Sequence, residues 1–152
     1  MDQKKSFIKR LLGAKTAEAP APIVDPRIQK IMEAIAYAET RGVKSDPYAF
    51  RKPSGSVTMG DDIGKYQVTE GTLGTYGQKY LGKPVDANYF QNTPSAQEEY
   101  MRRFIEDTLS RGNTPQQVAD IHRRGVKNSS PAGSNVYQDP KYVEIFNSYY
   151  NK

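Results

Sequence analysis

The chain has 152 residues, the size of one domain with a substantial hydrophobic core, and 11% of them are aromatic, which argues against a fully disordered chain. Its formal charge of +5 predicts affinity for polyanions such as nucleic acid, an anionic membrane or a bacterial cell wall, without choosing among them. Because the chain has no cysteine and only one histidine, disulfides, thiolate metal sites and cysteine nucleophiles are excluded, and a multi-histidine zinc site is not expected.

Residues 1–24 differ in composition from the rest of the chain, with five basic and two acidic residues and the Pro/Ala stretch "AEAPAP". Their apolar residues fall at helical spacing and are Phe7, Ile8, Leu11 and Leu12. We predict a short basic amphipathic helix and an extended linker that together dock on a partner protein or an anionic surface; a solvated tail is the alternative. Lys9 and Arg10 interrupt the apolar centre that a signal peptide would need, so no signal peptide is expected.

The body of the chain, residues 25–152, repeats one signal for the start of a helix, which is an Asp or Thr followed by Pro. The four capping residues are Asp25, Thr93, Thr114 and Asp139. In each pair the side-chain oxygen caps the helix, and the proline occupies the first helical position, where its missing N–H has no cost. Gln117, three residues after Thr114, completes a capping-box pattern.

Apolar periodicity extends these four starts into helices and adds a weaker helix after Thr69. The predicted helices cover about residues 26–41, 70–80, 94–111, 115–124 and 140–150. Residues 48–69 are rich in glycine and turn residues with short β-prone pieces, which predicts a small β-hairpin between the first and second core helices. The predicted fold class is therefore mostly α, an α+β arrangement of about five helices and one small hairpin. The sequence contains no run of roughly 20 apolar residues, which is the length that a membrane-spanning helix needs.

The stretch "IMEAIAYAETRG" places a carboxylate, Glu39, on the apolar face of the first predicted helix. The apolar positions four, seven and eleven residues before it are Ile35, Met32 and Ile28. Burial and the negative end of the helix dipole both raise the pKa of such a carboxyl, which is the state that a general acid needs near neutral pH. Alternatively, the side chain turns out to solvent or pairs with Arg41 or Arg51.

The second notable stretch is "GKYQVTEGT", residues 64–72, in which a polar Gln67 stands among apolar neighbours and Thr69 caps the helix that follows. A glutamine offers both an N–H donor and a carbonyl acceptor, which suits an N-acetyl group. A glutamine that bonds only nearby backbone is the other interpretation.

Together the two stretches resemble the catalytic domain of SLT-type lytic transglycosylases, lysozyme-like enzymes that cleave the glycan of peptidoglycan. In that family a helix ends in a catalytic Glu followed by Ser or Thr, and a Gly-x-x-Gln-x-x-x-Gly-Thr segment comes later. The matching residues here are Glu39, Thr40, Gly64, Gln67, Gly71 and Thr72. A third family element, an Ala-Tyr-Asn-x-Gly turn, falls on "DIHRRG" with His122 at the tyrosine position and Gly125 at the glycine.

The resemblance covers about residues 26–126 and departs from the family pattern in three ways. Glu70 stands where the family usually has proline, His122 replaces the tyrosine of the third element, and the interval between Glu39 and Gln67 is longer than expected.

The resemblance implies a reaction in which one carboxyl acts twice and no cofactor is needed. Glu39 would protonate the oxygen between N-acetylmuramic acid and N-acetylglucosamine and then accept the proton of the muramic acid 6-hydroxyl, which leaves a 1,6-anhydro sugar. Gln67 and Thr40 would orient the N-acetyl group or Glu39, and Tyr66 would form one wall of the cleft. Thr72 and His122 would also contact the glycan.

Three other functions are open at this point. A lysozyme would add water and usually needs a second carboxylate, for which Asp61 and Asp62 are the nearby candidates, although a DD pair in a turn is usually exposed to solvent. A lysozyme-like body could instead serve as a non-catalytic wall-binding or structural protein. Specific nucleic-acid binding is not expected, because dense basic patches occur only in "HRRGVK" and in the N-terminal segment.

The expected binding partner is therefore the peptidoglycan glycan strand. Since a wall enzyme must reach the wall, we expect a bacteriophage virion protein that is delivered to the bacterial periplasm, with residues 1–24 docked to other virion proteins. Release by host lysis or by a secretion apparatus is the alternative.

Overall fold

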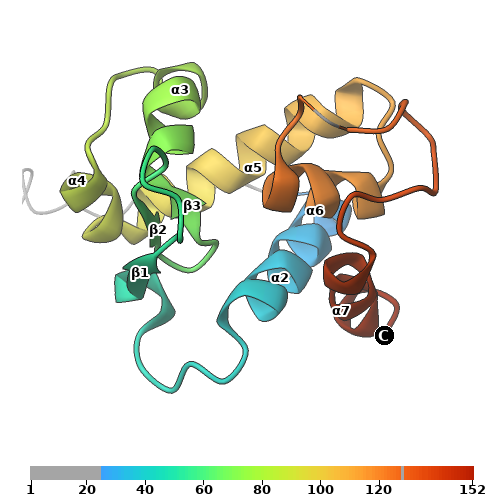
Figure 1. The fold of residues 1–152 in the computed structure, drawn as a ribbon, viewed down its shortest axis with the longest axis horizontal. Helices are drawn as coiled ribbons and strands as arrows, with labels where there is room; N and C mark the ends of the chain where they lie inside the picture. The colour runs from blue at the N-terminus through green and yellow to red at the C-terminus, as the bar shows by residue number, and fades with distance from the viewer. Residues whose placement is uncertain (1–24, 128) are drawn as a thin grey trace, which may run out of the picture.

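The computed structural model describes residues 25–127 and 129–152, so the helix, linker and docking role predicted for residues 1–24 lie outside the described residues. Six α-helices, one 3-10 helix and three short strands make up the described chain (Figure 1). In chain order they are α2 (Pro26–Thr40), η1 (Pro47–Ala49), β1 (Arg51–Pro53), β2 (Asp61–Ile63), β3 (Val68–Thr69), α3 (Glu70–Leu81), α4 (Ala87–Gln91), α5 (Pro94–Ser110), α6 (Pro115–Arg124) and α7 (Pro140–Tyr150). The predicted mostly-α fold with a small β element is confirmed.

The four predicted helix starts are confirmed, and three of them carry the expected cap. Asp25 accepts a hydrogen bond from the backbone N–H of Arg27 at 2.8 Å, and Asp139 accepts one from Tyr142 at 3.1 Å. Thr114 forms the full capping box with Gln117. At Thr93 the side chain makes no capping bond, yet the helix still begins at the following proline, whose fixed φ suits the first turn.

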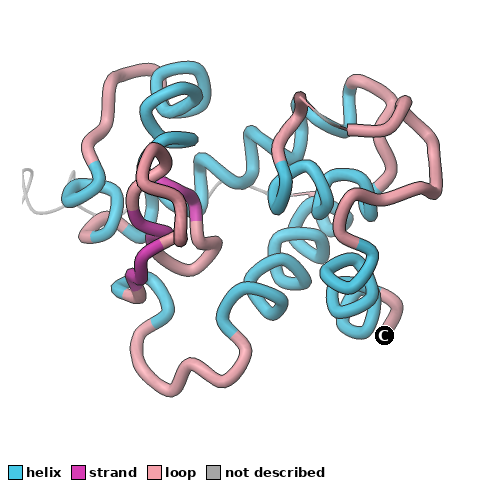
Figure 2. Tube along the Cα trace, viewed as in Figure 1, coloured by secondary structure: helices cyan, strands magenta, loops and turns pink. Residues whose placement is uncertain are grey.

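The β element is larger than the predicted hairpin, because a third strand joins it. The sheet order is β1-β2-β3, and both pairs are antiparallel. The strands are the magenta segments of the tube in Figure 2. In this register Asp62 lies between Lys52 on β1 and Thr69 on β3. The turn that leads to β3 includes Gly64, whose φ of +78° is easily accessible only to glycine.

The elements form two lobes with α5 between them (Figure 1). The sheet lobe consists of the three strands, α3 and α4, and the helical lobe consists of α2, α6 and α7. Helix α5 contacts α3 and α4 of the first lobe and α2 and α6 of the second. The short helix α4 has no counterpart in the sequence prediction, since it spans five residues with only Phe90 fully buried.

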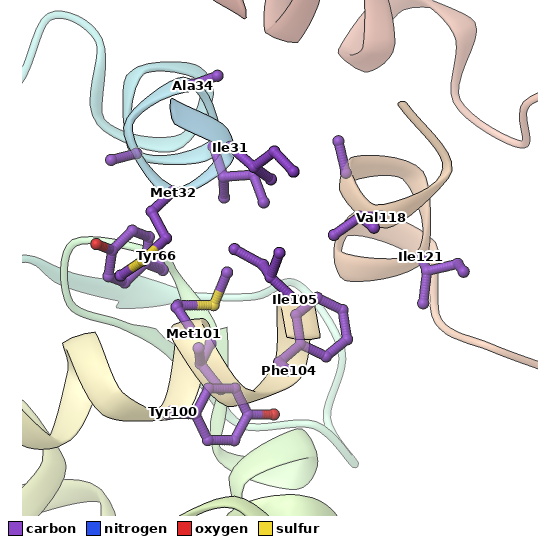
Figure 3. Close-up of a cluster of buried hydrophobic side chains, with 14 of the residues drawn as sticks. Ile31, Met32, Ala34, Tyr66, Tyr100, Met101, Phe104, Ile105, Val118 and Ile121 are labelled. Atoms are coloured by element: carbon purple, nitrogen blue, oxygen red, sulfur yellow. The ribbon is translucent and has the colours of Figure 1, made fainter. Parts of the chain in front are cut away.

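The hydrophobic core lies where α2, α5 and α6 converge (Figure 3). Its fully buried side chains include Ile31, Ile35, Met101, Ile105 and Val118. Burial of one such side chain contributes roughly 2 kcal/mol, so this cluster fixes the last turns of α2 relative to the other two helices. No helix in the described residues combines the length and the apolar character needed to cross a bilayer.

Candidate active site

The Glu39 side chain turns inward from the end of α2, in line with the buried stripe that precedes it. The carboxylate-bearing side chain is only 8% exposed. Neither arginine that the sequence offered as an alternative partner pairs with it: Arg41 is exposed, and Arg51 binds Asp61 and Glu70 instead. The stripe of Ile28, Met32 and Ile35 is buried as predicted.

Tyr142 holds the carboxyl in place. Its hydroxyl donates a 2.8 Å hydrogen bond to Oε1 of Glu39. The first turn of α7, which carries Tyr142, is itself fixed by the buried Asp120 of α6, which accepts the backbone N–H groups of Gln138 and Asp139 at 2.8 and 2.9 Å. Helix α6 therefore sets the position of the tyrosine.

Burial raises the pKa of Glu39 from the ordinary value of 4.5 to about 7. The Tyr142 hydrogen bond opposes this shift, as do the positive charges of Arg123 and Lys52, while the negative charge of Asp62 adds to it. At neutral pH a large fraction of the molecules thus keeps the proton on this carboxyl, as a general acid requires.

His122 connects the third predicted segment to the other two. Its Nε2 lies 2.7 Å from the carbonyl oxygen of Tyr66 and 3.6 Å from Oε1 of Glu39. Because a carbonyl can only accept, the Nε2 nitrogen carries the proton and donates to Tyr66. Burial lowers the pKa of His122 to about 4, so the ring is neutral at pH 7 and adds no charge beside Glu39.

Gln67 adopts a strained backbone and leaves one polar atom without a partner. Its φ of +52° is a left-handed conformation that is uncommon for a residue other than glycine and costs about 1 kcal/mol or more. The side-chain amide nitrogen donates to the carbonyl of Gly64 at 2.8 Å. The amide oxygen Oε1 is buried and has no hydrogen-bond partner among the described residues. A buried acceptor in this state lacks the hydrogen bond that a ligand N–H or a water molecule would supply.

Gly64 and Gly71 of residues 64–72 both occupy positions where a side chain would collide with a neighbour. A Cβ on Gly64 would overlap the side-chain amide of the fully buried Gln97, and one on Gly71 would press against Met59. Glu70, the residue that replaces the family's usual proline, has a role in the enlarged β element: it accepts hydrogen bonds from Arg51 and from the backbone N–H of Asp61, both at 2.9 Å.

The structure corrects the prediction that Tyr66 forms a wall of the site. The residue is 1% exposed, and its hydroxyl donates to Glu98 of α5 at 2.7 Å. Only its backbone carbonyl reaches the site, through His122. The loop geometry around Gln67 turns the ring inward, which a residue pattern alone does not reveal.

The hydroxyls of Thr40 and Thr72 form hydrogen bonds to residues three or four positions earlier in the chain. The Thr40 hydroxyl donates to the carbonyl of Ala36 at 2.6 Å, and the Thr72 hydroxyl accepts from that of Thr69 at 2.8 Å. Their contact with a glycan stays a prediction.

Of the two neighbouring aspartates, Asp62 belongs to the site and Asp61 does not. Asp61 forms an ion pair with Arg51 at 2.8 Å. Asp62 makes no side-chain hydrogen bond or ion pair in the part of the chain that the structure describes, and its charge acts on Glu39. Burial raises the pKa of Asp62 as well, which the charges of Lys52 and Arg123 partly offset.

Comparisons with protein families, with curated proteins and with solved structures found no match for this chain. Functional inference therefore starts from the residues of this site. Within residues 25–127 and 129–152, no group of three or more His, Cys, Asp or Glu side chains is arranged to hold a metal ion.

Three residues that act on Glu39, namely Tyr142, Arg123 and Lys52, were not predicted from the sequence. Tyr142 could have been noticed as a tyrosine on the inward face of the last helix, at a spacing of four from the buried Phe146. No local signal links it to Glu39, because the two residues are 103 positions apart.

Proposed function

We propose that the protein is a peptidoglycan lytic transglycosylase in which Glu39 is both the acid and the base. The observation that carries this proposal is the meeting of three segments far apart in the sequence. Glu39 ends α2, Gln67 belongs to the loop before β3, and His122 of α6 lies 3.6 Å from Glu39 and 2.7 Å from the backbone of that loop. These are the three segments on which the resemblance to the family rests.

The reaction would use the two protonation states of one carboxyl in turn. The protonated Glu39 gives its proton to the glycosidic oxygen as the bond from that oxygen to the anomeric carbon of N-acetylmuramic acid breaks. The resulting carboxylate accepts the proton of the muramic acid 6-hydroxyl while the 6-oxygen bonds to the anomeric carbon. Glu39 ends in its starting state, no water is consumed, and the product is a 1,6-anhydro end.

The other site residues would bind and orient the substrate and the acid. Oε1 of Gln67, the one buried side-chain polar atom without a hydrogen-bond partner among the described residues, would accept the N–H of an N-acetyl group. Tyr142 would hold the carboxyl in a fixed rotamer. The neutral His122 would fix the Gln67 loop against α6 without changing the charge beside the acid.

Digestion of purified peptidoglycan by the wild type and by Glu39→Gln, with mass analysis of the products, tests this proposal. We expect products lighter by one water molecule than hydrolysis products from the wild type and none from the variant. Equal activity of the two proteins would contradict a catalytic role for Glu39, and wall binding without any cleavage by the wild type would favour a non-catalytic module.

A second candidate, a water-adding lysozyme, is supported by one observation, the unpaired Asp62 near the acid. A carboxylate in this position could activate a water molecule or stabilise a positively charged transition state. The same digestion separates the two reactions, because a hydrolase leaves a reducing end and no anhydro sugar.

A further inference from the structure

The guanidinium of Arg123 extends over the ring of the tyrosine that holds Glu39. Its Cζ lies 5.6 Å from the centroid of Tyr142. Among the described residues its only ion pair is with Asp139, at 3.5 Å, and Asp139 lies closer to Arg124, at 3.1 Å. Arg123 is 43% exposed, so its donors remain accessible at the edge of the site.

Lys52, on strand β1 of the sheet lobe, is the second cation whose charge acts on Glu39. It lies directly opposite Asp62 in the β1–β2 pair, so both side chains are on one face of the sheet. Lys52 is exposed and forms no ion pair within the described residues. The charges of Lys52 and Arg123 both lower the pKa of Glu39 and that of Asp62, which places both cations within electrostatic reach of both carboxyls.

The charged groups around Glu39 do not cancel. The charges that act most strongly on it are those of two cations, Arg123 and Lys52, and of one carboxylate, Asp62. With Glu39 protonated, one positive charge is left over beside the acid. A neutral glycan such as chitin would gain nothing from this charge, whereas a glycan with a carboxylate close to the scissile bond would.

We infer that Lys52 and Arg123 recognise a carboxylate on the glycan and so select acidic glycans over neutral ones. This inference rests on the proposed function and names the substrate feature that the site reads. Two sources can present the carboxylate: the free lactyl group of muramic acid in a glycan without peptides, or the stem peptide where it is attached. Arginine can bind such a group with two donors, and lysine binds it as a point charge.

Binding to the Glu39→Gln protein tests the inference without cleavage of the ligand. Calorimetry would compare glycan fragments with stem peptides, the same fragments after amidase treatment, and chitin oligosaccharides of equal length. We expect at least one of the two acidic glycans to bind more tightly than chitin. The acidic glycan that binds more tightly identifies the source of the carboxylate. Adding Lys52→Met or Arg123→Met should weaken acidic-glycan binding by about two- to fivefold each and leave chitin binding unchanged.

Two further variants separate recognition from folding. Lys152→Met removes an exposed lysine beyond the far end of α7 and should keep the preference. Arg123→Lys keeps the positive charge and should therefore retain most of the affinity for acidic glycans that Arg123→Met loses. Equal affinity for chitin and both acidic glycans would overturn the inference, as would an unchanged preference in Lys52→Met and Arg123→Met. Failure of the proposed function would appear differently, as the absence of anhydro products from the wild type.

Discussion

The hydroxyl of Tyr142 donates a 2.8 Å hydrogen bond to Oε1 of Glu39 and thereby joins the start of α7 to the end of α2. The bond has two effects on the carboxyl. It fixes the rotamer, and it favours the ionised form, so it lowers the pKa that burial has raised. Burial has the larger effect, and the resulting pKa of about 7 leaves the carboxyl able to give and to accept a proton near neutral pH.

Tyr142→Phe should raise the pKa of Glu39 further, because it removes the hydrogen bond that favours the carboxylate. We expect the alkaline limb of the pH dependence of kcat/KM to move to higher pH. The value of kcat/KM at its optimum should fall about tenfold, since the carboxyl also loses its orientation. Measuring kcat/KM across pH with soluble glycan fragments checks both effects.

Tyr150→Phe on the same helix is the matched control, because the Tyr150 ring stacks on Phe146 and its hydroxyl makes no hydrogen bond among the described residues. It should leave the pH dependence unchanged. A Tyr142→Phe protein that loses activity with an unmoved alkaline limb would show that Tyr142 supports the fold and does not tune the acid.

Glu39→Gln should stabilise the folded protein at alkaline pH. The folded chain holds the Glu39 proton up to a pKa of about 7, whereas the unfolded chain releases it near 4.5. Raising the pH from 4.5 to 7 therefore favours the unfolded wild type, and the loss amounts to about 3 kcal/mol. Glutamine keeps the acceptor for Tyr142 but does not ionise, so it avoids this loss.

Urea unfolding at pH 8 and at pH 4 measures the effect. The variant should exceed the wild type in free energy of unfolding at pH 8, and the difference should nearly vanish at pH 4. Glu33→Gln removes an exposed carboxylate from the same helix and controls for the change in net charge. An equal difference at both pH values would mean that Glu39 is not held protonated by burial.

Much of the fold could be predicted because its signals are local. A capping residue and the following proline act within one helical turn, so all four such helices begin where predicted. The 3.6-residue period placed Glu39 on the same face of α2 as the buried Ile28, Met32 and Ile35, but it left open whether the side chain at the helix end turns inward or out to solvent. Helix α4 and the third strand escaped prediction, because their few residues carry no period long enough to recognise.

The surroundings of Glu39 depend on tertiary contacts, which the sequence pattern does not contain. Tyr142 reaches Glu39 from α7, whose start is fixed by hydrogen bonds to Asp120 of α6. Tyr66 is buried, and its hydroxyl donates a hydrogen bond to Glu98 of α5. In each case the deciding partner belongs to another element, so neither the presence of Tyr142 nor the absence of the Tyr66 ring from the site could be inferred.

Gly64→Ala and Gly74→Ala should change stability in opposite directions. At Gly64 the backbone has a φ of +78°, and a Cβ would overlap the amide of Gln97, which is fully buried and accepts the backbone N–H of Lys65 at 2.9 Å. We expect a loss of about 2 kcal/mol or more in the free energy of unfolding. Gly74 lies within α3 with open space around it, so alanine there should add about 0.5–1 kcal/mol.

Urea midpoints of the two variants and the wild type test this pair. If the Gly64 variant unfolded at the wild-type midpoint, the close approach of the Gln67 loop to Gln97 would be disproved.

Asp62→Asn distinguishes the transglycosylase from the hydrolase through product and pH dependence together. With one catalytic carboxyl, the variant should still form anhydro ends. Because the negative charge of Asp62 raises the pKa of Glu39, its removal should also shift the alkaline limb of kcat/KM to lower pH. Asp61→Asn is the control, because Asp61 pairs with Arg51 at 2.8 Å and should affect the stability of the β element without moving the pH dependence.

A hydrolase predicts the reverse for Asp62. Its second carboxylate would be needed for the reaction itself, so Asp62→Asn should abolish cleavage at every pH, and the wild-type products would end in reducing sugars. Retained cleavage with a shifted pH dependence would instead assign Asp62 an electrostatic role, in which it keeps the proton on Glu39 while Lys52 and Arg123 act in the opposite direction. The carboxylate beside the acid would then tune the pKa of Glu39 without taking part in bond cleavage.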